Sequence, residues 1–90
     1  MRYTFEPRKQ AANVKKHGYD FDDAHLVIEA KATLTFEDRR FDYGEQRFIT
    51  LGLLRGEVVV VVTTETDAEV RVISMRKADK NERQIYIGNL

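Results

Sequence analysis

Residues 33–77 contain four runs that favour β-strands, TLTFED, RFITLGLL, VVVVVTTE and EVRVISMRK, and only short links separate them. A parallel crossover needs about a dozen residues or more, so these links predict an antiparallel meander. The RGE link is typical of a short hairpin. Val58–Val62 is apolar at every position, which predicts a central strand that is covered on both faces. Together with the helices predicted below on either side of it, this sheet indicates the α+β class.

Two helices are expected before the sheet. Pro7 suits a first helical turn, and the cations before Gly18 suit a last turn, so the first helix is predicted over residues 7–17. Asp20 is a candidate N-cap, and apolar residues recur after it at helical spacing. A second helix is therefore predicted to run to about Ala30.

Asp79 and Glu82 have the spacing of a capping box, which predicts a C-terminal helix that begins near Lys80 and includes Tyr86. The expected fold is a single domain over residues 1–90. In it, two N-terminal helices pack on a four-stranded antiparallel sheet, and the C-terminal helix follows the sheet.

The composition disfavours several functional classes. The chain has no cysteine, which fits a reducing cytoplasm, and its two histidines, His17 and His25, belong to no metal-binding motif. We therefore expect no metal and no cofactor. The N-terminus lacks an apolar signal core and the longest apolar run is too short to cross a bilayer. These features predict a cytoplasmic protein without membrane contact.

The net charge of zero conceals an uneven distribution. Residues 1–17 carry five Lys and Arg against one Glu, and residues 71–90 carry five against two acids. Residues 18–70 carry twelve acids and five bases. If the two basic ends meet in space, they form a cationic patch suited to phosphates.

The first candidate site is the junction of the last strand and the last helix. Strict alternation along the strand would direct Arg71 and Lys77 to one face and Arg76 to the other. Arg83 and Tyr86 would be neighbours on the helix. Arginine can grip phosphate through two hydrogen bonds and tyrosine can stack on a base, which suits RNA. The alternative is a solvated surface with local ion pairs.

Two smaller groups are also candidates. His17, beside Lys16, can transfer protons near neutral pH, although cations also simply favour a helix C-terminus. Glu45 could serve as a general base with Arg47 as its electrostatic partner, or the two could form a weak surface ion pair. His25 lies near an apolar stripe and is expected to be a packing residue.

Three segments resemble one known family. They are FEPRKQAANVKKHGYDFDDA, GEQRFITLG and RVISMRKADKNERQIY, and they cover nearly the whole chain in the family's order and spacing. Together they are similar to the BrnT toxins of bacterial type II toxin-antitoxin systems. The resemblance implies a RelE-like ribonuclease that inhibits translation. It also implies a partner, a BrnA-like antitoxin that forms a ribbon-helix-helix dimer. Two toxins and two antitoxins would form a heterotetramer, and operator DNA would be contacted only through the antitoxin.

The resemblance assigns importance to residues in all three segments. Arg76 and Arg71 are expected to stabilise the phosphorane-like transition state, with Glu45 as base, Tyr86 as a stacking or proton-relay group and His17 in proton transfer. Positions expected to bind the RNA are Lys16, Arg47, Lys77 and Arg83; the resemblance also covers Ser74 and Glu82. The alternative is a toxin homologue that has lost activity and serves as the antitoxin's partner in operator repression. The neutral total charge motivates this alternative.

Overall fold

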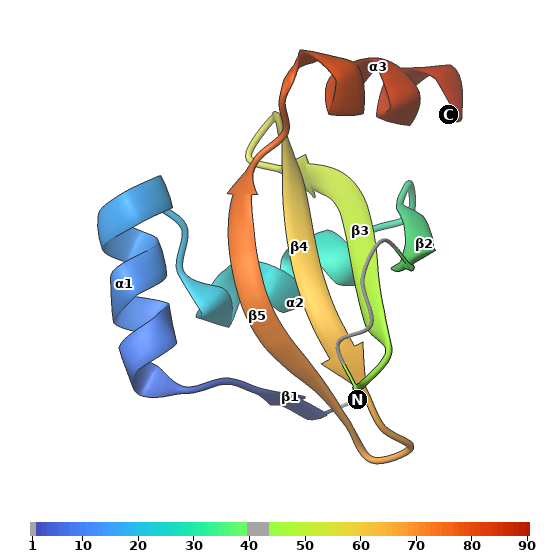
Figure 1. Cartoon of the computed structure of the whole chain (residues 1–90). Helices are drawn as coiled ribbons and strands as arrows, with labels where there is room; N and C mark the ends of the chain where they lie inside the picture. Colours follow the sequence, from blue (N-terminus) through green and yellow to red (C-terminus); the bar gives the residue numbers. More distant parts are fainter. Residues whose placement is uncertain (1, 40–43) are drawn as a thin grey trace.

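A computed structural model describes residues 2–39 and 44–90 of the chain (Figure 1). Its strands form a single sheet in the order β1-β5-β4-β3-β2. Their bounds are Arg2–Thr4 for β1, Leu34–Asp38 for β2, Arg47–Leu54 for β3, Glu57–Glu65 for β4 and Glu69–Lys77 for β5.

The meander predicted from the short links is confirmed, because β2, β3, β4 and β5 pair consecutively and antiparallel. The hairpin between β3 and β4 turns at Arg55 and Gly56, whose φ angles are 50° and 81°. Positive φ at both central residues matches a type I′ turn, whose twist suits a two-residue hairpin. The link between TLTFED and RFITLGLL lies partly outside the described residues.

The prediction of a purely antiparallel, four-stranded sheet is wrong. β1 adds a fifth strand that runs parallel to β5, with Arg2 opposite Glu69 and Thr4 opposite Arg71. A three-residue strand is too short to show an alternating pattern, and its partner lies at the other end of the sequence. The sheet is therefore mixed, and β1 ties the N-terminus to its edge.

The first predicted helix is confirmed as α1, Pro7–His17, which ends at Gly18 in the left-handed conformation. The second is shorter than predicted. A 3-10 turn, η1 (Phe21–Asp23), comes first and α2 spans only Ala24–Ile28. The Asp20 side chain accepts a hydrogen bond from the Asp22 N–H at 2.9 Å, as expected of an N-cap.

The C-terminal helix α3, Lys80–Gly88, begins with the predicted capping box. The Asp79 carboxylate accepts from the Glu82 N–H at 2.8 Å, and the Glu82 carboxylate accepts from the Asp79 N–H at 2.9 Å. Two backbone donors of the first turn are thereby satisfied, so α3 has a fixed start directly after β5.

Side chains of β4 enter two apolar clusters, one on each face of the sheet. Val59 and Val61 pack with α2 and η1, whereas Val58 and Val60 pack with Tyr86 of α3. This arrangement confirms that the valine run is a central strand covered on both faces. In Figure 1, α2 lies behind the sheet, α3 lies at the end where β3 turns into β4, and α1 lies beside β5.

Gly52 of β3 lies directly against Val27 of α2. A Cβ atom at this position would lie 2.9 Å from both Cγ1 and the carbonyl oxygen of Val27. Because part of that contact is backbone, we expect Gly52→Ala to lower the free energy of unfolding by about 1–3 kcal/mol. Urea unfolding measures this change. Gly88→Ala is the control, since a Cβ there meets nothing within 4 Å; equal effects of both substitutions would contradict the close-approach argument.

Candidate functional site

A β-bulge in β5 determines where its cations point. Val62 of β4 pairs with Ser74, but the next residue, Thr63, pairs with Val72. Ile73 is therefore an extra residue on β5. A bulge of this kind reverses the alternation of side chains beyond it.

The bulge corrects the prediction of strict alternation along β5. Arg71, Ser74 and Arg76 pair with alternate β4 residues, namely Thr64, Val62 and Val60, so all three side chains share the face on which α3 lies. Lys77 pairs with Val59 and faces the α2 side. Two arginines that were predicted on opposite faces are thus together, whereas Lys77 is separated from them.

Arg76 forms a bidentate ion pair with Glu82 of α3. Nη1 and Nη2 of Arg76 donate to Oε1 and Oε2 of Glu82 at 2.7 and 2.8 Å. The Arg76 hydrogen bonds, joined by the Asp79 N–H, hold the pKa of the Glu82 carboxyl below its usual range. The pair joins β5 to the first turn of α3, so the position of Arg76 depends on this carboxylate.

This depressed pKa predicts a dependence of stability on pH. A carboxylate whose pKa is lower in the folded state adds stability above its unfolded pKa and loses that stability as pH falls through the folded value. We therefore expect the free energy of unfolding to fall more steeply below about pH 5 in the wild type than in Glu82→Gln. Urea unfolding at several pH values measures both curves, and parallel curves would contradict the assignment.

Arg71 is held at the other end of the strand. Its Nη2 lies 2.8 Å from Oε1 of Glu6, which precedes α1. The β4 partners of Arg71 and Arg76 are four residues apart, so about 13 Å separates their Cα atoms. Each arginine is therefore paired with a different carboxylate, and Ser74 lies between the two arginines along β5.

Asn13 of α1 binds the edge of β5. Its Nδ2 donates to the Met75 carbonyl at 2.9 Å and its Oδ1 accepts from the Met75 N–H at 3.2 Å. Nδ2 also donates to the Tyr19 carbonyl at 2.9 Å. The buried amide thus continues the ladder where β1 no longer covers β5, and it fixes α1 against the strand.

A hollow of about 230 Å³ lies between α1 and β5. Lys16 and His17 line it from the helix, together with Lys9, and Ser74 lines it from the strand. Segments from the two basic ends of the sequence therefore meet at this hollow, although no cation of residues 71–90 lines it. We call the group formed by these four residues with Arg71 and Arg76 the β5 site.

The helix side of the β5 site carries uncompensated positive charge. Among the described residues, no ion pair involves Lys9, Lys16 or His17. Sequence reasoning missed Lys9 and Asn13. Their spacing with Lys16, at i, i+4 and i+7, is the signal that would have placed all three on one helix face.

Glu45 and Arg47 form the ion pair that the sequence suggested, with 3.7 Å between a carboxylate oxygen and Nη2. Arg47 pairs with Thr64, which pairs in turn with Arg71. Arg47 therefore shares the face of Arg71, with β4 between them.

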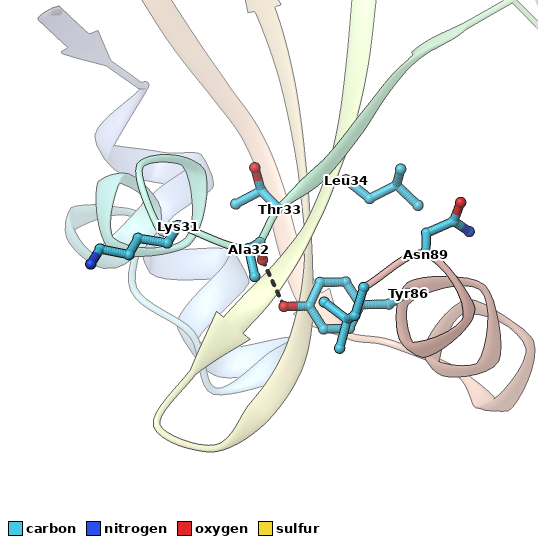
Figure 2. Close-up of a pocket in the computed structure, with 7 residues that line it drawn as sticks. Lys31, Ala32, Thr33, Leu34, Tyr86 and Asn89 are labelled. Carbon is cyan, nitrogen blue, oxygen red and sulfur yellow. Dashed lines mark hydrogen bonds between the residues drawn. The ribbon is translucent and has the colours of Figure 1, made fainter.

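Tyr86 lies in the core. It is 2 % exposed and packs against the β4 cluster described above. Its hydroxyl donates to the Ala32 carbonyl at 2.6 Å, beside a cavity of about 380 Å³ that is drawn in Figure 2. Burial leaves no ring face for a base to stack on, and the hydroxyl is already engaged, so the residue anchors α3 to the chain before β2.

Lys77 and Arg83 line another groove, between α3 and the β3–β4 hairpin. The Lys77 ammonium is 4.0 Å from the Glu57 carboxylate. Neither residue lines the hollow at α1, so the structure does not bring them together with Lys16 and His17.

Residues 2–39 and 44–90 contain no group of three or more His, Asp or Glu side chains placed to hold a metal ion. None of the helices in these segments has the length and apolarity needed to cross a membrane.

A family comparison bears on this site. The model of a family described as ribonuclease toxin, BrnT, of type II toxin-antitoxin system matches residues 5–82. The match includes α1 and all of β5, and therefore every residue of the β5 site. No curated protein matches the chain.

Proposed function

Because the chain belongs to the BrnT family of ribonuclease toxins from type II toxin-antitoxin systems, we propose that it is a metal-independent endoribonuclease. It cleaves RNA at the β5 site and thereby inhibits translation. Inhibition of translation would place this action in the cytoplasm.

One observation carries the location of the site. The α1–β5 hollow places Lys9, Lys16 and His17 beside Ser74, which shares its strand face with Arg71 and Arg76. Cations from two distant segments that lie near one another suit a polyanionic backbone, because each phosphate contact releases counterions. A hydroxyl-bearing residue, Ser74, lies between the arginines and can donate a hydrogen bond to a phosphate oxygen.

The proposed reaction is transesterification within the RNA. The 2′-oxygen forms a bond to the adjacent phosphorus, and the bond from that phosphorus to the 5′-oxygen breaks. The products are a 2′,3′-cyclic phosphate and a 5′-hydroxyl end. One group takes the proton of the 2′-hydroxyl and another gives a proton to the departing 5′-oxygen.

The residues divide these tasks. Arg76 stabilises the charge that develops on the phosphorane-like transition state, and Arg71 holds a neighbouring phosphate, since the two lie far apart along β5. His17 lines the hollow from α1 and takes part in proton transfer. Glu45 precedes β3, beside Arg47 at the Arg71 end of the sheet, so a role as base would place it at a phosphate held by Arg71 and not at one held by Arg76. Lys16 and Arg47 bind the flanking backbone.

A cleavage assay with the purified protein tests the proposal. We expect labelled RNA to be cut equally well with and without EDTA, and to carry 2′,3′-cyclic phosphate ends. Intact RNA in the presence of folded protein would contradict the enzyme, and a requirement for added divalent cations would contradict its metal independence.

Adjacent lysines of α1 provide a matched comparison. Lys16 lines the hollow and Lys15 does not. We expect Lys16→Ala to weaken RNA binding and to reduce the slope of log K against log salt by about 0.7, the value for one phosphate contact to a single strand. Lys15→Ala should keep the wild-type slope. Fluorescence anisotropy at several salt concentrations measures both, and equal slopes for the two variants would remove Lys16 from the site.

The family implies an antitoxin partner. We propose that this partner is a BrnA-like ribbon-helix-helix protein, that two toxins and two antitoxins form the complex, and that operator DNA is contacted through the antitoxin.

A second function is favoured by one observation: both strand arginines of the β5 site already hold a carboxylate, Glu6 or Glu82. A homologue with neutralised arginines would act as a partner of the antitoxin in repression without cutting RNA. RNA binding that falls steeply with salt supports the ribonuclease, whereas absence of RNA binding by the free protein supports this second function.

A further inference from the structure

An apolar groove of about 450 Å³ lies between α3 and the β3–β4 hairpin, away from the α1–β5 hollow. Its apolar lining consists of Leu53, Val58, Tyr86, Ile87 and Leu90. We call it the α3 groove.

Three of the exposed large apolar side chains lie around the groove. Ile87 and Leu90 are 63 % and 72 % exposed, and Leu53 faces them from the hairpin at 46 %. Single exposed apolar residues are ordinary, but several around one concavity mark a surface that another protein covers.

Positive charge borders the groove. Lys77 is compensated by Glu57, 4.0 Å away. Within the described part of the chain, no carboxylate lies within ion-pair distance of Arg83. A partner that fits this surface therefore presents apolar side chains to the groove and an acidic side chain to Arg83.

We propose that the α3 groove is the docking surface for the antitoxin, through an apolar segment that carries an acidic residue. The proposal rests on the partner that the family implies and is independent of whether the β5 site cleaves RNA. Leu53, Ile87 and Leu90 are the anchors, and Arg83 fixes the register of the segment. Since the groove and the β5 site are different surfaces, the antitoxin is held by contacts that do not themselves occupy the catalytic residues.

Other occupants fit less well. RNA binding relies on phosphate contacts, and this surface offers mainly aliphatic side chains. A second copy in a two-fold contact would bring the same cationic border against this one. A peptide of opposite charge satisfies both the apolar and the electrostatic features.

The test uses a purified BrnA-like antitoxin as the probe and isothermal titration calorimetry. We expect Leu53→Asp to weaken the complex about thirtyfold or more, as loss of a central anchor does. Leu26→Asp on α2 is the matched control, because Leu26 has the same 46 % exposure and does not line the groove; it should remain within about threefold of wild type. Arg83→Glu should also weaken the complex, and a Lys in place of the contacting acid of the antitoxin should restore it.

Several outcomes would overturn the proposal. Wild-type affinity of Leu53→Asp would do so, as would an equal loss in Leu26→Asp. So would a wild-type toxin dimer that Leu53→Asp converts to monomer with antitoxin affinity unchanged. RNA cleavage by the free Leu53→Asp variant, measured in parallel, distinguishes a failure of the docking proposal from a failure of the proposed ribonuclease activity. The variant should cleave RNA at the wild-type rate whatever its affinity for the antitoxin.

Discussion

Replacement of Arg76 with alanine is expected to slow RNA cleavage by about a hundredfold or more, the usual cost of losing one preorganised contact to a developing oxyanion. The guanidinium lies on the same strand face as Ser74 and is held by both oxygens of Glu82. That carboxylate limits its rotamers, so little reorganisation is needed when a phosphate arrives. Single-turnover cleavage of a labelled RNA measures the effect.

Two further variants test whether slow cleavage is specific to loss of the Arg76 guanidinium. Arg39→Ala removes another exposed arginine, which is paired with Glu37 at 2.9 Å, and should leave cleavage at the wild-type rate. Glu82→Gln breaks the charge pair but keeps the guanidinium, so it should retain cleavage to within about tenfold of wild type. If Arg76→Ala cut RNA normally, or if Glu82→Gln were as slow as Arg76→Ala, the role assigned to Arg76 would be wrong.

Asn13→Ala is expected to lower the free energy of unfolding by about 2–4 kcal/mol. The Asn13 amide is the hydrogen-bond partner of both backbone groups of Met75, and each buried group left unsatisfied costs about 1–3 kcal/mol. The same change loosens α1 from β5, so Lys16 and His17 lose their position beside Ser74. Cleavage should therefore fall together with stability.

Gln10→Ala provides the comparison. Gln10 lies on the same helix and donates one hydrogen bond to the Asp20 carboxylate at 2.7 Å, without contact to the strand backbone. We expect a loss of about 1 kcal/mol or less and normal cleavage. Equal urea midpoints for Asn13→Ala and wild type would show that the amide does not secure α1.

The sequence was sufficient to predict the elements whose signals are local. The meander, the hairpin at Arg55 and Gly56, the ends of α1 and the capping box of α3 all follow from spacing, glycine and capping chemistry. The valine run likewise revealed the central strand. The coarse α+β architecture could therefore be predicted from the spacing of apolar residues and from turn chemistry.

Features that depend on distant partners were not predictable. β1 exists because β5 offers it an edge, and the bulge at Ile73 is visible only in the pairing of β5 with β4. That one residue changed which cations share a face. Tyr86 was predicted to stack on a base or relay a proton, but it is buried against the valines of β4. Amphipathic spacing does not distinguish an aromatic residue of the core from one that stacks on a ligand.

The β5 site draws its residues from opposite ends of the chain, since α1 supplies Lys16 and His17 and β5 supplies Arg71 and Arg76. During synthesis, α1 leaves the ribosome first and must wait for the last strand. At about 5–20 residues per second, that delay lasts several seconds. A nascent or prematurely terminated chain that lacks β5 therefore has no assembled site, and the proposed activity appears only in molecules whose translation is essentially complete.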